Sequence, residues 1–294
     1  MEKRKFHIIT DSGSDLPEEY FQKNGVECMK LGFIMNGVEY HGEEGQDISL
    51  QDFYNRLRGG ELPTTYQITP EIAKEHIEKA LKKGQDVLVV AFSSGLSGTA
   101  GSFFTAQKQL LEEYPERKIF VVDSLCASLG QGLLVHYVVE KADSGASIEE
   151  TYEYAEELKL HIDHQFTVND LFHLKRGGRV SSTTAVVGTM LNIKPTLHVS
   201  NEGKLTATGK VMGRRKALKK LVENMESTAD VTDSDPIFIS HGDCLEDVKT
   251  VSEMIKKNFP NNPIFAHYIG PVIGSHSGCA TLALFFKTKR RADN

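Results

Sequence analysis

The side chains best suited to chemistry are concentrated in one short loop of the sequence, SSGLSGT at residues 93–99. The loop directly follows an apolar run at residues 87–92, which is typical of a buried strand in a parallel sheet. The residues after it have the pattern of a helix, and open α/β sheets bind ligands where such a strand ends and a helix begins. Glycines let the backbone approach a ligand, while hydroxyls and free N–H groups favour an anionic oxygen. The loop therefore predicts an anion pocket that contains Ser93, Ser94 and Ser97.

A second hydroxyl pair, Thr64 and Thr65, lies in the segment PTTYQ. In a parallel sheet this segment and the serine loop would meet at the carboxyl edge and face one ligand. Ser and Thr hydroxyls more often cap a helix or a turn. We nevertheless expect Thr65 and Ser94 to contact a ligand, because more glycines and hydroxyl groups are clustered around them than a single helix cap or turn needs.

One histidine and one arginine are candidates for contact with the same anion. His276 lies in the glycine-bounded segment GPVIGSHSG, where it could donate to a carboxylate or phosphate, act as an acid or base, or only hold the turn. Arg179 follows the paired glycines of LKRGGR, in which Gly177 is expected as a left-handed cap after a short helix. Arg176 suits the carboxyl end of that helix. Arg179 lies beyond the cap, so we expect it to contact an anion or a partner.

Catalytic and metal-binding templates fit the sequence poorly. The segment around Ser97 lacks the second glycine of a G-x-S-x-G nucleophile elbow. The sequence contains no Walker phosphate loop, no dinucleotide fingerprint and no H-E-x-x-H motif. The histidines of H-I-D-H (161–164) and H-G-D (241–243) lack the companion residues of a recognised metal site. We expect no catalytic residue, no cofactor and no metal.

Strand and helix patterns alternate through the first half of the chain, which predicts a layered α/β domain with a parallel sheet. The expected strands are residues 6–10, 26–33, 87–92 and 118–122. One helix is expected to begin at Pro17, and four others are expected at 49–57, 70–84, 105–114 and 147–160. Ser49, Thr69 and Ser147 have the types and positions of helix N-caps.

The pattern changes after about residue 160. We expect strands at 165–168, 237–240 and 264–268, helices at 214–225 and 245–259, and a hairpin that turns at 201–203. A hairpin among alternating elements suggests a mixed sheet. The sequence therefore predicts an α/β fold of two closely packed domains, residues 1–160 with a parallel sheet and residues 161–294 with a mixed sheet.

Composition narrows the function. The chain has 294 residues, of which 39% are hydrophobic and 25% charged, and its net charge is −6. An acidic chain has no general attraction to phosphate backbones, so we expect no nucleic-acid partner. No apolar run approaches the roughly 18 residues of a transmembrane segment. Four scattered cysteines without a pairing pattern are typical of a cytoplasmic protein.

Taken together, these segments resemble a known family. They are, in chain order, ITDSGSDLP, PTTYQ, SSGLSGT, the Asp-Ser pair at 123–124, DLFHLKRGGRV, the Lys-Pro pair at 194–195, VMGRRKAL, HGD and GPVIGSHSG. Their order and spacing resemble the DegV family of bacterial fatty-acid-binding proteins, which includes the fatty-acid-binding subunit of fatty acid kinase. The resemblance implies a two-domain DegV-like fold without enzymatic activity of its own. It would enclose one long-chain fatty acid, with the carboxylate in the interdomain cleft and the tail in an apolar tunnel.

The resemblance also implies roles for particular residues. Thr65, Ser94 and His276 would contact the carboxylate, and Arg179 occupies the arginine position of the family's GGR segment. Residues 1–160 would supply the carboxylate-binding loops, and residues 161–294 would close the lipid cleft.

A kinase partner would dock on the basic helix that contains Arg214 and Arg215. Three departures from the family pattern affect these roles: Tyr66 replaces a serine, Cys279-Ala280 replaces Pro-Gly, and Met212 replaces an arginine that relatives often carry.

Three functions follow as hypotheses. The first is a cytoplasmic carrier that holds a long-chain fatty acid and presents its carboxylate to a separate fatty acid kinase. The second is a hydrolase or transferase that acts on a small anionic substrate, with Ser97 or Ser94 as nucleophile and His276 as base. The third is a sensor of a nucleotide or sugar phosphate.

Overall fold

The computed structural model describes residues 4–41, 48–180 and 192–291. Its first sheet has four parallel strands in the order β2-β1-β6-β7. These strands are β1 (Phe6–Asp11), β2 (Val26–Met29), β6 (Asp86–Ala91) and β7 (Ile119–Asp123). A small antiparallel sheet beside it has the order β4-β3-β5, with β3 (Gly32–Met35), β4 (Val38–Tyr40) and β5 (Thr64–Tyr66).

The second half of the chain forms a mixed sheet of six strands in the order β10-β9-β8-β13-β11-β12. The strands are β8 (Ile162–Thr167), β9 (Ile193–Val199), β10 (Leu205–Met212), β11 (Ile237–His241), β12 (Ile264–Tyr268) and β13 (Leu282–Lys287). Only the β11 and β12 pair is parallel among these neighbours. The predicted fold class, a parallel sheet followed by a mixed sheet, is confirmed.

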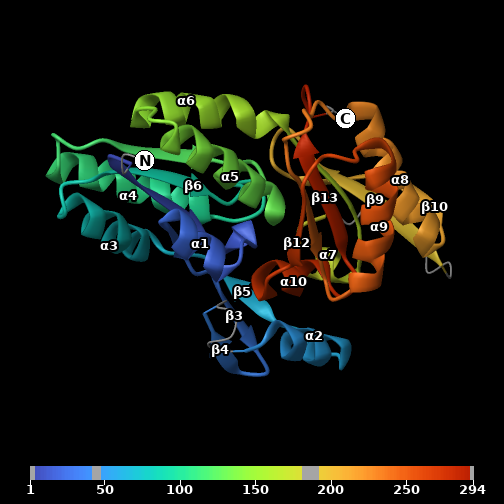
Figure 1. The fold of residues 1–294 in the computed structure, drawn as a ribbon. Helices are drawn as coiled ribbons and strands as arrows, with labels where there is room; N and C mark the ends of the chain where they lie inside the picture. The colour runs from blue at the N-terminus through green and yellow to red at the C-terminus, as the bar shows by residue number, and fades with distance from the viewer. Residues whose placement is uncertain (1–3, 42–47, 181–191, 292–294) are drawn as a thin grey trace.

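Ten α-helices cover these sheets in the described part of the chain (Figure 1). They are α1 (Glu18–Asn24), α2 (Leu50–Arg58), α3 (Pro70–Leu81), α4 (Thr99–Glu113), α5 (Leu129–Asp143), α6 (Ile148–Leu158), α7 (Phe172–Arg176), α8 (Arg214–Thr228), α9 (Leu245–Asn258) and α10 (Pro271–Ser277). The predicted N-caps are confirmed: the side chains of Ser49, Thr69 and Ser147 each accept a backbone N–H of the first helical turn.

Strand β6 is apolar along its length because helices cover both faces of its sheet. Leu88 and Val90 belong to a hydrophobic cluster that includes α5, whereas Val87 and Val89 pack with α3 and α4 on the opposite face. The buried parallel strand predicted from this run is confirmed, and it ends at the serine loop.

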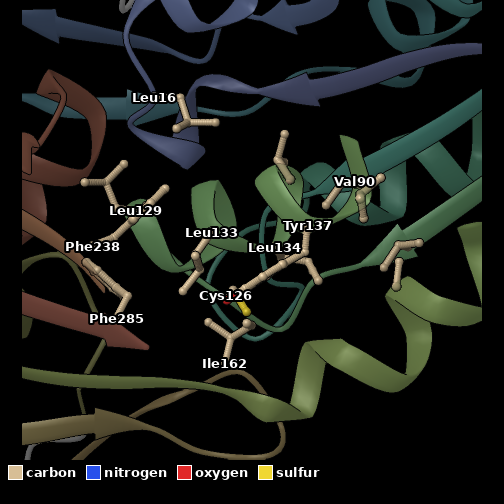
Figure 2. Packing of buried hydrophobic residues seen from close by; sticks show 14 of the residues in the cluster. Leu16, Val90, Cys126, Leu129, Leu133, Leu134, Tyr137, Ile162, Phe238 and Phe285 are labelled. Carbon is tan, nitrogen blue, oxygen red and sulfur yellow. The ribbon is translucent and has the colours of Figure 1, made fainter. Parts of the chain in front are cut away.

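Helix α5 lies between the two large sheets and was not predicted from the sequence. It packs against β6 of the first sheet and against β8, β11 and β13 of the second. Figure 2 shows Leu129, Leu133 and Leu134 of this helix between the two groups of strands. Eleven of its 15 residues are buried, so it lacks the polar face that gives an amphipathic helix its period.

Three further elements differ from expectation. The strand expected at 26–33 is two strands, β2 and β3, which belong to different sheets. The segment around His276 is the helix α10 rather than a loop. Strand β13 was not predicted, although it lies at the centre of the mixed sheet.

The position of α5 gives a direct test of the packing. Leu133 is fully buried, and Leu133→Ala is expected to lower the free energy of unfolding by about 2–5 kcal/mol in urea titrations, because it leaves a cavity between the sheets. Glu153→Ala, an exposed change on α6, is the control and should alter the unfolding free energy by less than about 0.5 kcal/mol. Equal effects of the two changes would contradict the packing described.

Candidate ligand cavity

A cavity of about 170 Å³ opens at the carboxyl edge of the first sheet, on the same face of the mixed sheet as α5 and beyond the start of that helix. On a scale where one water needs roughly 10–15 Å³, this volume holds on the order of a dozen groups of water or methylene size. Most of its wall is apolar and includes Phe92, Phe166, Leu174, Val199, Leu205 and Phe285. The cavity therefore suits the hydrocarbon part of a ligand.

The two ends of the cavity differ in exposure. Tyr66 and Gln67, at and just after β5, are exposed where they line the cavity, whereas Phe166 and Phe285 of the mixed sheet are buried. The open mouth is therefore at β5, and the closed end lies against the mixed sheet.

The mouth carries a hydrogen-bonded pair, Thr65 and His276. Thr65 Oγ1 lies 2.8 Å from His276 Nε2, which brings β5 and α10 together although their residues are far apart in the sequence. Figure 1 shows β5 beside α10. When the imidazole proton is on Nε2, His276 donates to Thr65, and the Thr65 hydroxyl is free to donate to an anionic oxygen in the cavity.

His276 is neutral at neutral pH. Burial lowers its pKa to about 4, and the nearby cations Arg179 and Arg176 act in the same direction. Its Nδ1 is buried and has no hydrogen-bond partner among the described residues. A Cβ on Gly177 would overlap this Nδ1, so only a glycine at position 177 leaves room for the imidazole in this position.

Arg179 brings positive charge to the mouth. Its Nε donates to the Leu96 carbonyl oxygen at 3.2 Å and its Nη1 to the Gly177 carbonyl oxygen, and no ion pair to it is formed within the described ranges. Burial lowers the pKa of the guanidinium, which nevertheless stays charged at neutral pH. Half-buried and without an acidic partner in this part of the structure, it favours an anionic ligand.

Arg176 holds the two sides of the mouth in place. Its Nη2 donates to the Pro63 carbonyl oxygen at 2.7 Å and to the Ser275 carbonyl oxygen at 3.2 Å, so it links the chain before β5 to α10. The left-handed position after α7 is taken by Gly178, with φ of 71°, instead of Gly177 as expected.

The structure brings four of the seven predicted ligand-binding residues to the cavity: Thr65, Ser97, Arg179 and His276. Thr64, Ser93 and Ser94 do not line it. The Ser93 hydroxyl is buried and donates to the Gly203 carbonyl oxygen at 2.8 Å, while Thr64 and Ser94 are exposed and the Ser94 N–H donates to Asp123. The loop turns through the Ser97 N–H to Ser93 carbonyl hydrogen bond of 3.1 Å, and this turn directs Ser97 towards the cavity.

Several cavity residues were missed from the sequence. Ser277 lines the cavity next to His276, and its hydroxyl is buried without a partner among the described residues. Its adjacency to His276 was the available signal. Ser128, His164 and Ser240 also line the wall, but they come from segments that only the tertiary structure brings together.

The expected docking helix is only partly free. Arg214 forms an ion pair with Asp247 at 2.8 Å and donates to the Ala280 carbonyl oxygen at 2.6 Å. Arg215 is exposed, and the neighbouring Met212 is 59% exposed.

In residues 4–41, 48–180 and 192–291, no group of three His, Cys, Asp or Glu side chains could hold a metal ion. Within the same ranges no helix is both long and apolar enough to cross a bilayer.

This fold of two large sheets with an apolar cavity defines a DegV-type protein. A family model described as "Uncharacterised protein, DegV family" matches residues 5–289, and the chain belongs to this family. It is similar to a DegV domain-containing protein of Clostridium perfringens, with 43% identity over 96% of this chain and 97% of that protein.

Solved structures show the same fold. A DegV family protein from Thermus thermophilus, described for its fatty acid binding, aligns with a TM-score of 0.86 and 30% identity over 97% of this chain and 100% of that one. DegV from Bacillus subtilis, described as a fatty acid binding protein, aligns with a TM-score of 0.81 and 28% identity over 98% and 100% of the two chains.

The low pKa of His276 can be measured by NMR titration of its imidazole, with His276→Asn used to assign the signal. The midpoint is expected near pH 4 instead of the ordinary 6.5. Because the folded state binds this proton more weakly than the unfolded chain, this group lowers the unfolding free energy as the pH falls from about 6.5 towards 4. A midpoint near 6.5 would contradict the burial and the cationic surroundings described.

Proposed function

We propose that this protein binds one long-chain fatty acid, with its carboxylate at Thr65 and His276 and its tail in the cavity. The observation that carries the proposal is the combination of a polar, cationic mouth with an apolar, closed interior in a single cavity. The fatty acid binding described for the Thermus thermophilus and Bacillus subtilis relatives supports it. Residues 1–160 supply Thr65 and Ser97, and residues 161–294 supply Arg179 and His276, so the two proposed domains hold the ligand between them.

The energetics assign different tasks to the two ends of the ligand. A dozen buried methylenes at about 0.8 kcal/mol each contribute roughly 10 kcal/mol, against an association cost of about 4–15 kcal/mol. Hydrogen bonds to the charged carboxylate add about 1.5–3 kcal/mol each. The hydrocarbon therefore supplies most of the affinity, and the mouth residues fix which end faces outward.

The geometry favours binding over catalysis by a serine. A serine nucleophile needs a hydrogen bond to its base. In the described part of the chain, His276 Nε2 is hydrogen-bonded to Thr65, whereas the Ser97 hydroxyl is hydrogen-bonded to Thr99 Oγ1 at 3.0 Å. His276 is therefore not placed as the base for Ser97. Ser94 is exposed outside the cavity. A phosphate sensor is also disfavoured, because the wall behind the mouth is mostly apolar.

The proposal places the carrier in the cytoplasm, in line with its four free cysteines. We also propose that a separate kinase binds the carrier and phosphorylates the outward-facing carboxylate of the bound fatty acid. The exposed Arg215 on α8 is the proposed contact for this kinase.

Mass spectrometry of the denatured, purified protein is expected to find a copurified fatty acid. Thr65→Val removes the hydroxyl at similar side-chain volume and should weaken palmitate affinity about tenfold, the effect of losing one hydrogen bond to a charged group. The ¹³C signal of carboxyl-labelled palmitate should broaden in this variant while most of the lipid remains bound.

Ser94→Ala is the matched control, because it removes an exposed hydroxyl outside the cavity, and it should leave binding unchanged. Protein that is free of lipid and takes up neither palmitate nor oleate would refute the proposed function. Equal losses in the two variants would refute the assignment of the carboxylate to Thr65.

The kinase contact has its own test. Arg215→Glu is expected to slow acyl phosphate formation by the fatty acid kinase of the same organism at least several-fold, with palmitate affinity unchanged. Lys83→Glu, the same charge reversal on an exposed turn after α3, is the control. If both variants support the wild-type rate, the kinase does not use this helix.

A further inference from the structure

The apolar wall of the cavity is interrupted by several hydroxyls that the proposed function does not use, and two of them are hydrogen-bonded to each other. Ser128, just before α5, and Ser240 on β11 both line the cavity. Their Oγ atoms lie 2.9 Å apart, and Ser128 also bonds to the carboxyl group of Asp15. Both serines are buried. The two hydroxyls and the buried carboxyl group of Asp15 therefore form a polar cluster in a cavity whose wall is otherwise mostly apolar.

We propose that Ser128 and Ser240 bind an oxygen substituent near the middle of the acyl chain, so that the cavity takes a mid-chain hydroxy fatty acid. The inference rests on the proposed function and names the class of fatty acid.

The free hydrogen-bonding capacity of the pair lies at Ser240. Each hydroxyl has one donor and two acceptor sites. With Asp15 ionised, Ser128 donates to Asp15, and the Ser240 hydroxyl keeps its proton and its lone pairs for the ligand. With Asp15 protonated, the direction reverses and Ser240 can donate its proton to the ligand. A ligand hydroxyl fits both arrangements, and a methylene fits neither.

Burial raises the pKa of Asp15 to about 7, so both arrangements exist near neutral pH. The other buried carboxyl group nearby, Asp11, acts in the same direction. His164, which lines the same part of the wall, offers nothing to a ligand. Its Nε2 accepts the Ala127 N–H at 3.2 Å, and its Nδ1 lies 3.0 Å from the Ile162 carbonyl oxygen.

The helix α10 sets the position of the substituent. Asp15 accepts the Gly270 N–H at 2.9 Å at the start of this helix, and His276 lies near its end. Side chains along α10, including Val272 and Ile273, line the cavity between them. Six residues of helix span about 9 Å, which is the reach of roughly seven carbon–carbon bonds of an extended chain. Because Asp15 joins the hydroxyl pair to the start of α10, we infer that, with the carboxylate at His276, the pair faces the middle of the acyl chain, in the region of carbon 8.

The experiment compares the affinities of stearic acid and three hydroxystearic acids, by competition with a fluorescent fatty acid. The hydroxyl is placed beside the carboxylate, near carbon 8, or at the terminal carbon. Wild-type protein is expected to bind the mid-chain isomer at least tenfold more tightly than the terminal isomer. Ser240→Ala should reduce that ratio to about one. Ser124→Ala removes a buried hydroxyl that accepts the Cys126 N–H outside the cavity lining, and it should leave the ratio unchanged.

The comparison of isomers on the wild-type protein does not depend on the folding of any variant. Equal affinity for the mid-chain and terminal isomers would overturn the inference and leave the proposed function intact, since all the acids would still bind. Failure of every acid, stearic acid included, would overturn the proposed function itself. A preference that persists in Ser240→Ala would also overturn the assignment to this pair.

Discussion

The hydrogen bond between Thr65 and His276 is the interaction on which the site depends. It joins β5, which lies beside the parallel sheet, to α10, which belongs to the second half of the chain. Arg176 supports the same junction through the carbonyl oxygens of Pro63 and Ser275. An apolar cavity needs such a polar mouth, because a carboxylate carried inward would lose its hydration without partners. The contact thereby fixes both the place of the opening and the orientation of an anionic, long-chain ligand.

The interior behind this mouth exists because α5 covers only part of the space between the two large sheets. Its buried side chains fill the region beside β6 on one face and beside β8, β11 and β13 on the other. Beyond the start of the helix at Leu129, residues of the mixed sheet, of α10 and of the β5 segment line the cavity.

The sequence predicted best what depends on neighbouring residues. The capping serines and threonine, the continuous apolar run of β6 and the hairpin of β9 and β10 follow from local rules, and the structure has them. Helix α5 escaped prediction because it is buried on nearly all sides and therefore has no regular alternation of apolar and polar faces. Within the serine loop, the turn of the backbone brings Ser97 to the cavity and leaves Ser94 exposed. The residue types and their spacing in the sequence do not predict that turn. Ser128 and Ser240 are 112 residues apart, so only the packing of the two sheets reveals the pair.

The direction in which the ligand lies in the cavity can be measured. A crystal structure with ω-bromopalmitic acid locates both ends of the molecule, because the bromine gives an anomalous signal. We expect the bromine at the closed end of the cavity, against the mixed sheet, and the carboxylate within hydrogen-bond distance of Thr65. Bromine at the mouth, or a ligand bound elsewhere on the protein, would contradict it.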